Sequence, residues 1–376
     1  MRSLLTLLLL FLLLTTASLA QAINWHPSTA VLNQRLKVER TDFTMQGRLL
    51  LYTIKPLRLA LEIDSFSGDP QRIVDLISRW SGRVDGLKRF RAIRQMQIEQ
   101  GLVRLAEQHM EWRADTLTTP QGVIRYFQGS YKAGSWQGKL GSLVLNKPLP
   151  NMALPPSIFP MQLLGIAAKG SGRTGTATLE QGLVPGLTLQ KLKLTTQARS
   201  SKGVLWQLEG DKGQLELMPI WHHLQAMPQW QQGVAWRIRS LGVKELTPIS
   251  GQFLLSKLKL EGPWPMSPTE PLKQMQGSAQ WQAQELAIRV GGGEAYGLRK
   301  GAEQLQCRTA SGSFEVEGGR LLLKAWQGVV QLRGGEAKVK GLGVEQLYPP
   351  LHKPWRYRVT QQGMQQPPWW LNPDIS

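Results

Sequence analysis

The chain has 376 residues, and its 45 lysine and arginine residues outnumber its 26 aspartate and glutamate residues, giving a formal net charge of +19. This length suits two or three ordinary domains or one extended β structure. The charge argues against cationic partners and predicts attraction to polyanions, namely nucleic acid, anionic lipid headgroups, lipopolysaccharide or acidic glycans. The single cysteine, Cys307, excludes a disulfide within the chain.

The first residues have the pattern of an export signal. Arg2 supplies a positive charge, residues 4–14 are almost wholly apolar, and Ala20-Gln21-Ala22 matches a small-residue cleavage site. An uncleaved anchor over residues 4–22 is the alternative, since this stretch approaches the length of a membrane span. In either case we expect an exported chain, which argues against nucleic acid and nucleotide cofactors. Without disulfides or glycosylation sequons, the chain fits the periplasm of a Gram-negative bacterium, free or anchored to the inner membrane.

Strands are expected first, over residues 35–63, where apolar and polar residues alternate in short runs. A helical insertion should follow. Asp69 is a candidate N-cap with Pro70 at the first helical position, and the apolar spacing predicts helices near residues 70–80 and 87–112.

From residue 123 onward, strand-like alternation and frequent glycine predict a β structure built from similar hairpins. The expected organisation is a leader (1–22), an α+β region (23–147), a proline-rich connection (148–160), a β-repeat groove region (161–348) and a tail rich in proline and tryptophan (349–376). The expected fold is mainly β with an N-terminal helical insertion. Its extended, twisted antiparallel sheet should form an open groove or taco-like half-barrel.

A unit of two basic residues around one apolar residue recurs along the chain, as in Lys191-Leu192-Lys193. Successive side chains of a strand point to opposite faces, so each unit predicts one cationic and one apolar face. Candidate groove residues are Leu192, Ile238, Leu258 and Val339. Candidate contacts to anionic headgroups are Lys191, Lys193, Arg237, Arg239, Lys257 and Lys259. Arg89 and Arg91, at the junction of the expected helices, form either a solvated helix face or a further headgroup patch.

Tryptophan is abundant, with 14 residues, and it often follows a glycine closely and precedes a glutamine, as in Gly277-Ser278-Ala279-Gln280-Trp281-Gln282. Indole rings with nearby amides can stack on sugars and hydrogen-bond to them. The alternative, which we favour, is that tryptophan fills wide spaces in a β core.

No motif indicates catalysis or a resident cofactor. Gly170-Ser171-Gly172-Arg173-Thr174-Gly175 matches the dinucleotide fingerprint, but the residues after it alternate as a strand, which predicts a glycine-rich hairpin instead. His222 and His223 are adjacent, and on a strand they would point to opposite faces, so they do not form a metal site. No nucleophile elbow or pair of catalytic carboxylates is apparent. We therefore expect a protein that is not an enzyme and needs no cofactor.

The glycine-punctuated β region, with recurring glycine–tryptophan elements after an apolar N-terminal segment, resembles protein N of type II secretion systems and the AsmA-like envelope proteins. The stretches that carry the resemblance are residues 277–281 and 312–341, within a region of similarity over about 123–360. Gly318-Gly319-Arg320-Leu321-Leu322-Leu323 looks like a terminal hairpin of that family. The resemblance implies a curved, apolar β groove facing the periplasm and a role in secretion or lipid traffic.

The expected function is therefore that of a non-enzymatic periplasmic protein. It would hold or guide anionic lipid or lipopolysaccharide, or assist assembly of a secretion apparatus by binding its proteins. A glycan- or peptidoglycan-binding envelope protein is the alternative.

Overall fold

The computed structural model describes residues 32–53, 58–73, 95–106, 109–147, 159–172, 174–198, 204–225, 245–264, 271–291, 302–332, 335–349 and 357–362. Over these residues, 18 strands belong to one large open antiparallel sheet, so the expectation of a mainly β protein is confirmed. The helical elements described there are α3 (Leu217–Gln225), the 3-10 helix η3 (Pro271–Gln274) and one turn at residues 71–73. The expected N-terminal helical insertion is not supported.

The chain divides into two compact units. Unit 1 comprises residues 1–184 and 193–204, and unit 2 comprises residues 185–192 and 205–376. Unit 1 contains β1 (Leu32–Glu39), β2 (Phe43–Thr53), β3 (Arg58–Gly68), β4 (Met96–Ala106), β5 (His109–Thr119), β6 (Gly122–Lys132), β7 (Ser135–Leu145), β8 (Met161–Ser171) and β9 (Thr174–Val184). Residues of both units form β10 (Leu187–Ala198) and β11 (Val204–Glu216). Unit 2 contains β12 (Glu245–Trp264), β13 (Gln276–Gly291), β14 (Ala302–Glu317), β15 (Arg320–Leu332), β16 (Gly335–Gly341), β17 (Glu345–Tyr348) and β18 (Tyr357–Gln362).

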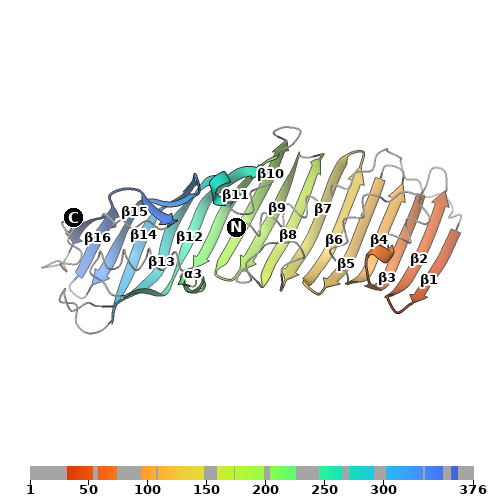
Figure 1. Cartoon of the computed structure of the whole chain (residues 1–376), viewed down its shortest axis with the longest axis horizontal. Helices are drawn as coiled ribbons and strands as arrows, with labels where there is room; N and C mark the ends of the chain where they lie inside the picture. The colour runs from red at the N-terminus through yellow and green to blue at the C-terminus, as the bar shows by residue number, and fades with distance from the viewer. Residues whose placement is uncertain are drawn as a thin grey trace. The chain divides into compact units, whose positions relative to one another are not determined.

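The strands of unit 1 form a meander in which each strand from β1 to β9 pairs antiparallel with the next (Figure 1). The strands β2 to β9 have 11 residues each. At about 3.3 Å per residue, each is about 35 Å long. Residues 148–160, the expected proline-rich connection, join β7 to β8, which pair directly with each other. Positions on neighbouring strands therefore stay in register across the unit.

Unit 2 has longer strands and a branched end. Its β12 has 20 residues, and β12, β13, β14 and β15 pair in chain order. Beyond them, β15 pairs with both β16 and β17, and β16 pairs with β18.

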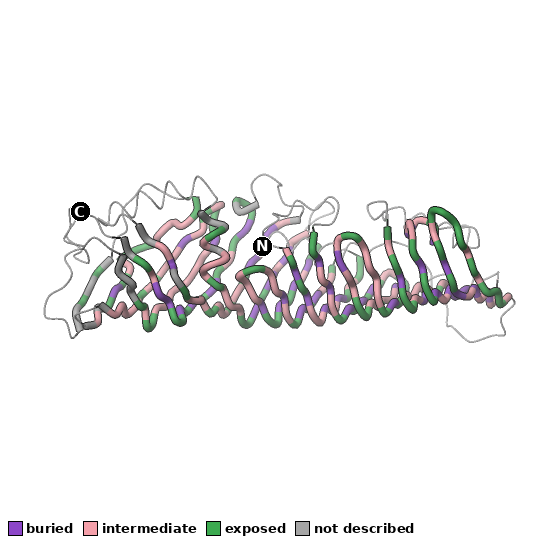
Figure 2. Tube along the Cα trace, turned by 90° about the horizontal axis from the view of Figure 1, so that it is seen from below, coloured by how far each residue is buried: buried purple, intermediate pink, exposed green. Residues whose placement is uncertain are grey.

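Each strand of unit 1 presents apolar side chains to one face, the inner face, and mostly polar side chains to the other, the outer face. Exposed and buried positions alternate along the strands, as Figure 2 shows by colour. Leu59 and Leu61 of β3 are completely buried, and Met161 and Leu163 of β8 are as well. Alternation of this kind is the signature of a sheet with one covered face.

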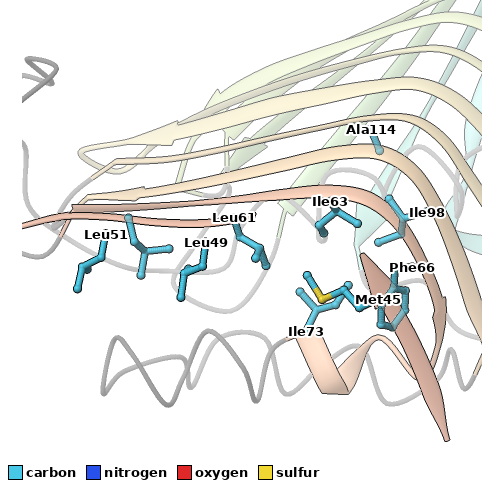
Figure 3. Close-up of a cluster of buried hydrophobic side chains, with 10 residues drawn as sticks. Met45, Leu49, Leu51, Leu61, Ile63, Phe66, Ile73, Ile98 and Ala114 are labelled. Carbon is cyan, nitrogen blue, oxygen red and sulfur yellow. The ribbon is translucent and has the colours of Figure 1, made fainter. Parts of the chain in front are cut away.

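The best-defined core of unit 1 lies on the inner face of β2 and β3 (Figure 3). Ile73, from the helical turn, packs into it beside Met45 and Phe66. The turn begins as expected, because the backbone N–H of Gln71 donates to Asp69 Oδ1 at 2.9 Å, which is the geometry of a helix N-cap.

A row of unusual backbone conformations crosses the strands. Gln100, Tyr126 and Gly165, at the middle of β4, β6 and β8, have φ values of 52°, 55° and 63°. In the strand register these positions align with Asp115 and Glu180 on β5 and β9. In unit 2, left-handed residues also lie inside strands: Lys191, Lys257, Glu285 and Ala325. A left-handed residue inside a strand is the geometry of a β-bulge, which bends the strand.

The bulges change which residues face inward. On β4 the inner positions step from Ile98 to Gly101, and on β5 they step from Ala114 to Leu117, three residues instead of two. Beside Ile98 the strands curve toward the side that carries the core side chains (Figure 3). The bend thus lets the two halves of a strand direct apolar side chains toward a common interior.

The expected helix over residues 87–112 is wrong from residue 96 onward, because β4 and β5 occupy that region. The helical spacing comes from Ile98, Leu102 and Leu105, but Leu102 pairs with Arg113 on the outer face while Ile98 and Leu105 face inward. An apolar residue on the outer face thus imitates the spacing of an amphipathic helix. Arg89, Arg91 and the rest of residues 74–94 lie outside the described residues.

We predict that Gln100→Gly stabilises unit 1 by up to about 1 kcal/mol, because a left-handed conformation costs a residue with a Cβ atom about 1–2 kcal/mol. Gln97→Gly, on the same strand but without a positive φ, should instead destabilise it by about 0.5–1 kcal/mol. Urea unfolding monitored by circular dichroism measures both. Equal destabilisation by the two variants would contradict the assignment of the bulge.

Candidate anion-binding site

The recurrent basic–apolar–basic units lie as their alternation predicts. Leu192 is 2% exposed while Lys191 and Lys193 are exposed, and Val339 is 8% exposed between two exposed lysines. Leu258 is half-buried between the exposed Lys257 and Lys259. Arg237, Ile238 and Arg239 lie outside the described residues. At Leu192 and Val339 the apolar side chain is therefore covered by protein.

The inner face is less completely covered on β4, β5 and β6. Ile98, Ala114 and Tyr131 are buried there, but the other apolar side chains of this face are half-buried: Val103, Leu105, Met110, Trp112, Leu117, Ile124 and Phe127. These half-buried side chains form a partly accessible apolar surface on the inner face of unit 1.

Five tryptophans pack against a glycine on the following strand. A Cβ atom at Gly341, for example, would lie 2.2 Å from Nε1 of Trp326, and one at Gly129 would lie 2.4 Å from Cζ2 of Trp112. The pairs are Trp112–Gly129, Trp136–Gly170, Trp206–Gly262, Trp281–Gly312 and Trp326–Gly341. An aromatic ring over a cross-strand glycine covers backbone that would otherwise be bare. Trp136, Trp206 and Trp281 are buried, so the core interpretation holds for these three.

The glutamine after four of these tryptophans points to the opposite face. Gln137 pairs across the sheet with Lys169, and Gln327 pairs with Lys340. Gln207 donates from Nε2 to Glu261 Oε2 at 3.0 Å. The recurring tryptophan–glutamine dipeptide thus places a ring in the interior and an amide on the outer face.

A depression of about 710 Å³, the unit 1 trough, lies on the outer face over β4 to β9. Its lining includes four basic residues and one acidic residue, five residues with amide or hydroxyl groups, and several glycine and apolar residues. The outer-face residues that line it are Leu102, Arg104, Glu111, Arg113, Gln128, Ser130, Gln137, Lys139, Ala167, Lys169, Thr176 and Thr178.

The trough residues form rows that run across the strands. In one row Arg113, Gln128 and Lys139 are consecutive cross-strand partners. In the next, Ser130 pairs with Gln137, whose Nε2 donates to Ser130 Oγ at 3.1 Å. Neighbouring strands lie about 4.8 Å apart, so Arg113 and Lys139 are separated by about 10 Å.

Most of the positive charge in the trough is uncompensated. The one acidic side chain, Glu111, is shared by Arg104, at 3.6 Å, and His109 Nε2, at 3.1 Å. Among the described residues, Arg113, Lys139 and Lys169 form no ion pair. Because they are solvated, they attract anions at a range that salt shortens.

A second depression, of about 890 Å³, lies at the ends of the same strands. We call it the strand-end depression. It combines Trp136 and Thr196, both buried, with His109, Lys132 and Ser135 at the strand tips. It also shares Glu111, Ser130, Gln137, Lys169 and Thr176 with the unit 1 trough.

Unit 2 has a similar outer-face depression of about 480 Å³, the unit 2 trough. Ser311, Gln327 and Lys340 are consecutive cross-strand partners there, and Lys340 in turn pairs with Arg358. The same order of serine, glutamine and lysine occurs in unit 1 as Ser130, Gln137 and Lys169. Two separate regions of the chain therefore build the same polar, cationic row.

The remaining motifs have structural roles. A hairpin joins β8 to β9, as expected: Gly170 pairs with Gly175 and Ser171 with Thr174, and Gly172 has φ 56°. His222 lies on α3 rather than on the expected strand. The described residues contain no cluster of histidine, cysteine and carboxylate side chains that could hold a metal ion. Burial raises the pKa of the Cys307 thiol, which disfavours its reactive thiolate.

Comparison of the chain with known protein families, characterised proteins and solved structures gave no match. Among the described residues, no helix combines the length and apolar character that crossing a bilayer requires. The expected leader, residues 1–22, lies outside them.

We predict that Gly341→Ala destabilises unit 2 by about 1–3 kcal/mol, because the new methyl group would overlap the ring of Trp326. Gly343→Ala is the matched control. A Cβ atom there would meet nothing within 4 Å, so its effect on stability should be small. Thermal unfolding of the two variants makes the comparison. If both variants unfold alike, Trp326 does not pack on Gly341.

Proposed function

We propose that the protein is a non-enzymatic envelope protein that holds or guides anionic lipid or lipopolysaccharide, in the manner of protein N of type II secretion systems or of AsmA-like proteins. The observation that carries the proposal is the division of the sheet into an apolar inner face and a polar outer face with excess positive charge. Such a division suits a ligand that has both acyl chains and anionic groups.

The acyl chains would lie against the half-buried inner face of β4 to β6. Met110 and Leu105 are cross-strand partners close to the strand ends, and Phe127 lies deeper, against Trp112, at 6.4 Å between ring centroids. Transfer of apolar surface from water contributes about 25 cal/mol per Å², so even partial coverage of an acyl chain gives several kcal/mol.

The headgroup would lie at the strand ends. The backbone of the sheet separates the two faces, so lysines at mid-strand, such as Lys191 and Lys193, cannot reach a headgroup whose chains lie beside Leu192. In the strand-end depression, by contrast, His109 and Lys132 lie next to the buried Trp136. This edge is where one molecule can contact cations and the apolar interior together.

We predict that Met110→Asp lowers lipid retention about ten-fold or more, because it places a charge in the acyl path. Native mass spectrometry of the full chain, after incubation with phosphatidylglycerol or lipopolysaccharide, measures the retained lipid. Gln97→Asp, on the exposed outer part of β4, is the control and should retain lipid normally.

A second variant tests the proposal even if Met110→Asp fails to fold. Lys132→Glu lies at an exposed tip and should weaken retention of anionic lipid without affecting phosphatidylcholine. The proposal fails if the folded wild-type protein retains neither lipid, or if Met110→Asp and Lys132→Glu both bind as the wild type does.

A further inference from the structure

Tyr126 is an unusual residue outside the unit 1 trough lining, two residues before Gln128, which lines the trough. Its side chain is 70% exposed and its backbone is left-handed, with φ 55°. The bulge sets this conformation, which is costly for a bulky residue. Since glycine or asparagine would adopt this conformation at lower cost, packing and backbone preference do not explain a tyrosine here.

A glycine supports the ring of Tyr126. Its Cδ2 atom lies 3.0 Å from the place that a Cβ atom on Gly141 would occupy, on the neighbouring strand β7. The ring therefore leans on bare backbone on one side and leaves most of its surface to solvent. An exposed, supported aromatic ring is a platform on which the C–H face of a sugar can stack.

The row beside this platform carries hydrogen-bonding and charged groups. Gln128 follows Tyr126 by two residues on the outer face, with Arg113 and Lys139 as its cross-strand partners. An amide both donates and accepts, as a sugar hydroxyl does, and a guanidinium binds a carboxylate through paired N–H groups. Ser130 and Gln137, already joined to each other, extend this lining.

The direction of the rows indicates an elongated ligand. Because the rows cross the strands, a chain lying in the trough meets a new residue about every 4.8 Å. Arg113 and Lys139 are two strands apart, about 10 Å, which is close to the length of one disaccharide in an extended glycan. A flat bilayer surface cannot enter a depression lined in this way, whereas a single polymer chain can.

We propose that the unit 1 trough binds a linear, carboxylate-bearing glycan across β4 to β9. Tyr126 stacks on a sugar ring, Gln128, Ser130 and Gln137 bind hydroxyl groups, and Arg113, Lys139 and Lys169 pair with the carboxylates. The unit 2 trough, with Ser311, Gln327, Lys340 and Arg358, offers similar amide, hydroxyl and basic groups. This proposal does not rest on the lipid-holding function proposed above, although Ser130, Gln137 and Lys169 line both depressions.

The test measures binding of the purified full chain to an oligogalacturonate long enough to cross six strands, about 25 Å at about 4.8 Å per strand. The neutral methyl ester of the same oligomer is the comparison ligand. Isothermal titration at several salt concentrations should show at least ten-fold tighter binding of the acid than of the ester. The difference in affinity should decrease as the salt concentration rises.

Two sets of variants separate stacking from charge. Tyr126→Asn keeps a residue that tolerates the left-handed backbone, and it should weaken both ligands about ten-fold, which equals about 1.4 kcal/mol. Arg113→Gln combined with Lys139→Gln should weaken the acid by a similar factor and leave the ester unchanged. Lys147→Gln, exposed and outside the trough lining, is the charge-matched control and should change neither.

Several results would overturn the proposal. One is equal affinity for acid and ester, and another is an unchanged affinity in Tyr126→Asn. Phosphatidylglycerol vesicles or a single-stranded oligonucleotide that bind as tightly as the oligogalacturonate, and are weakened by the same variants, would show a membrane-docking or general polyanion surface instead. Loss of glycan binding with normal lipid retention would leave the proposed function standing, and the reverse result would leave the glycan site standing.

Discussion

The structure depends on the need of a sheet with one apolar face to cover that face. In unit 1, side chains such as Leu59, Leu61 and Met161 are completely buried. The left-handed residues at mid-strand provide the bend that turns the two halves of a strand toward a shared interior. Each bend costs backbone strain at one position and allows burial along the rest of the strand. Strained, exposed positions such as Gln100 are therefore part of how the core forms.

The same constraint arranges the outer face. Because eight successive strands have equal length and keep their pairing, positions on neighbouring strands line up in straight rows. Each outer-face side chain therefore belongs to a row that crosses the strands. Lys139, for example, lies directly beside Gln128 of the neighbouring strand. Regular pairing, which is needed to bury the inner face, thus also produces the ordered polar lining of the unit 1 trough.

Alternation within a strand can be read from sequence, and it located the exposed Lys191 and Lys193 around the buried Leu192. The Asp69 cap is also a local signal and was predicted correctly. The strands β4 and β5 were missed because Leu102, an apolar residue on the outer face, completes a helical spacing with Ile98 and Leu105. The unit 1 trough could not be predicted, since its rows join residues such as Arg113 and Lys139 whose proximity depends on register. Tyr126 carries no sequence signal, because its left-handed backbone is set by the bend.

The tryptophan–glycine contacts have a consequence for how such a chain changes its length. A ring on one strand needs its bare backbone on the next, as Trp136 needs Gly170 and Trp281 needs Gly312. The smallest unit that can be inserted or deleted without breaking such a contact is therefore a pair of strands. Duplication or loss of a whole hairpin preserves every tryptophan–glycine contact. It also preserves the direction of the following strands and the face to which their side chains point. Gain or loss of a single strand disrupts the contacts, the strand direction and the face. Relatives of this protein should differ in length by multiples of two strands.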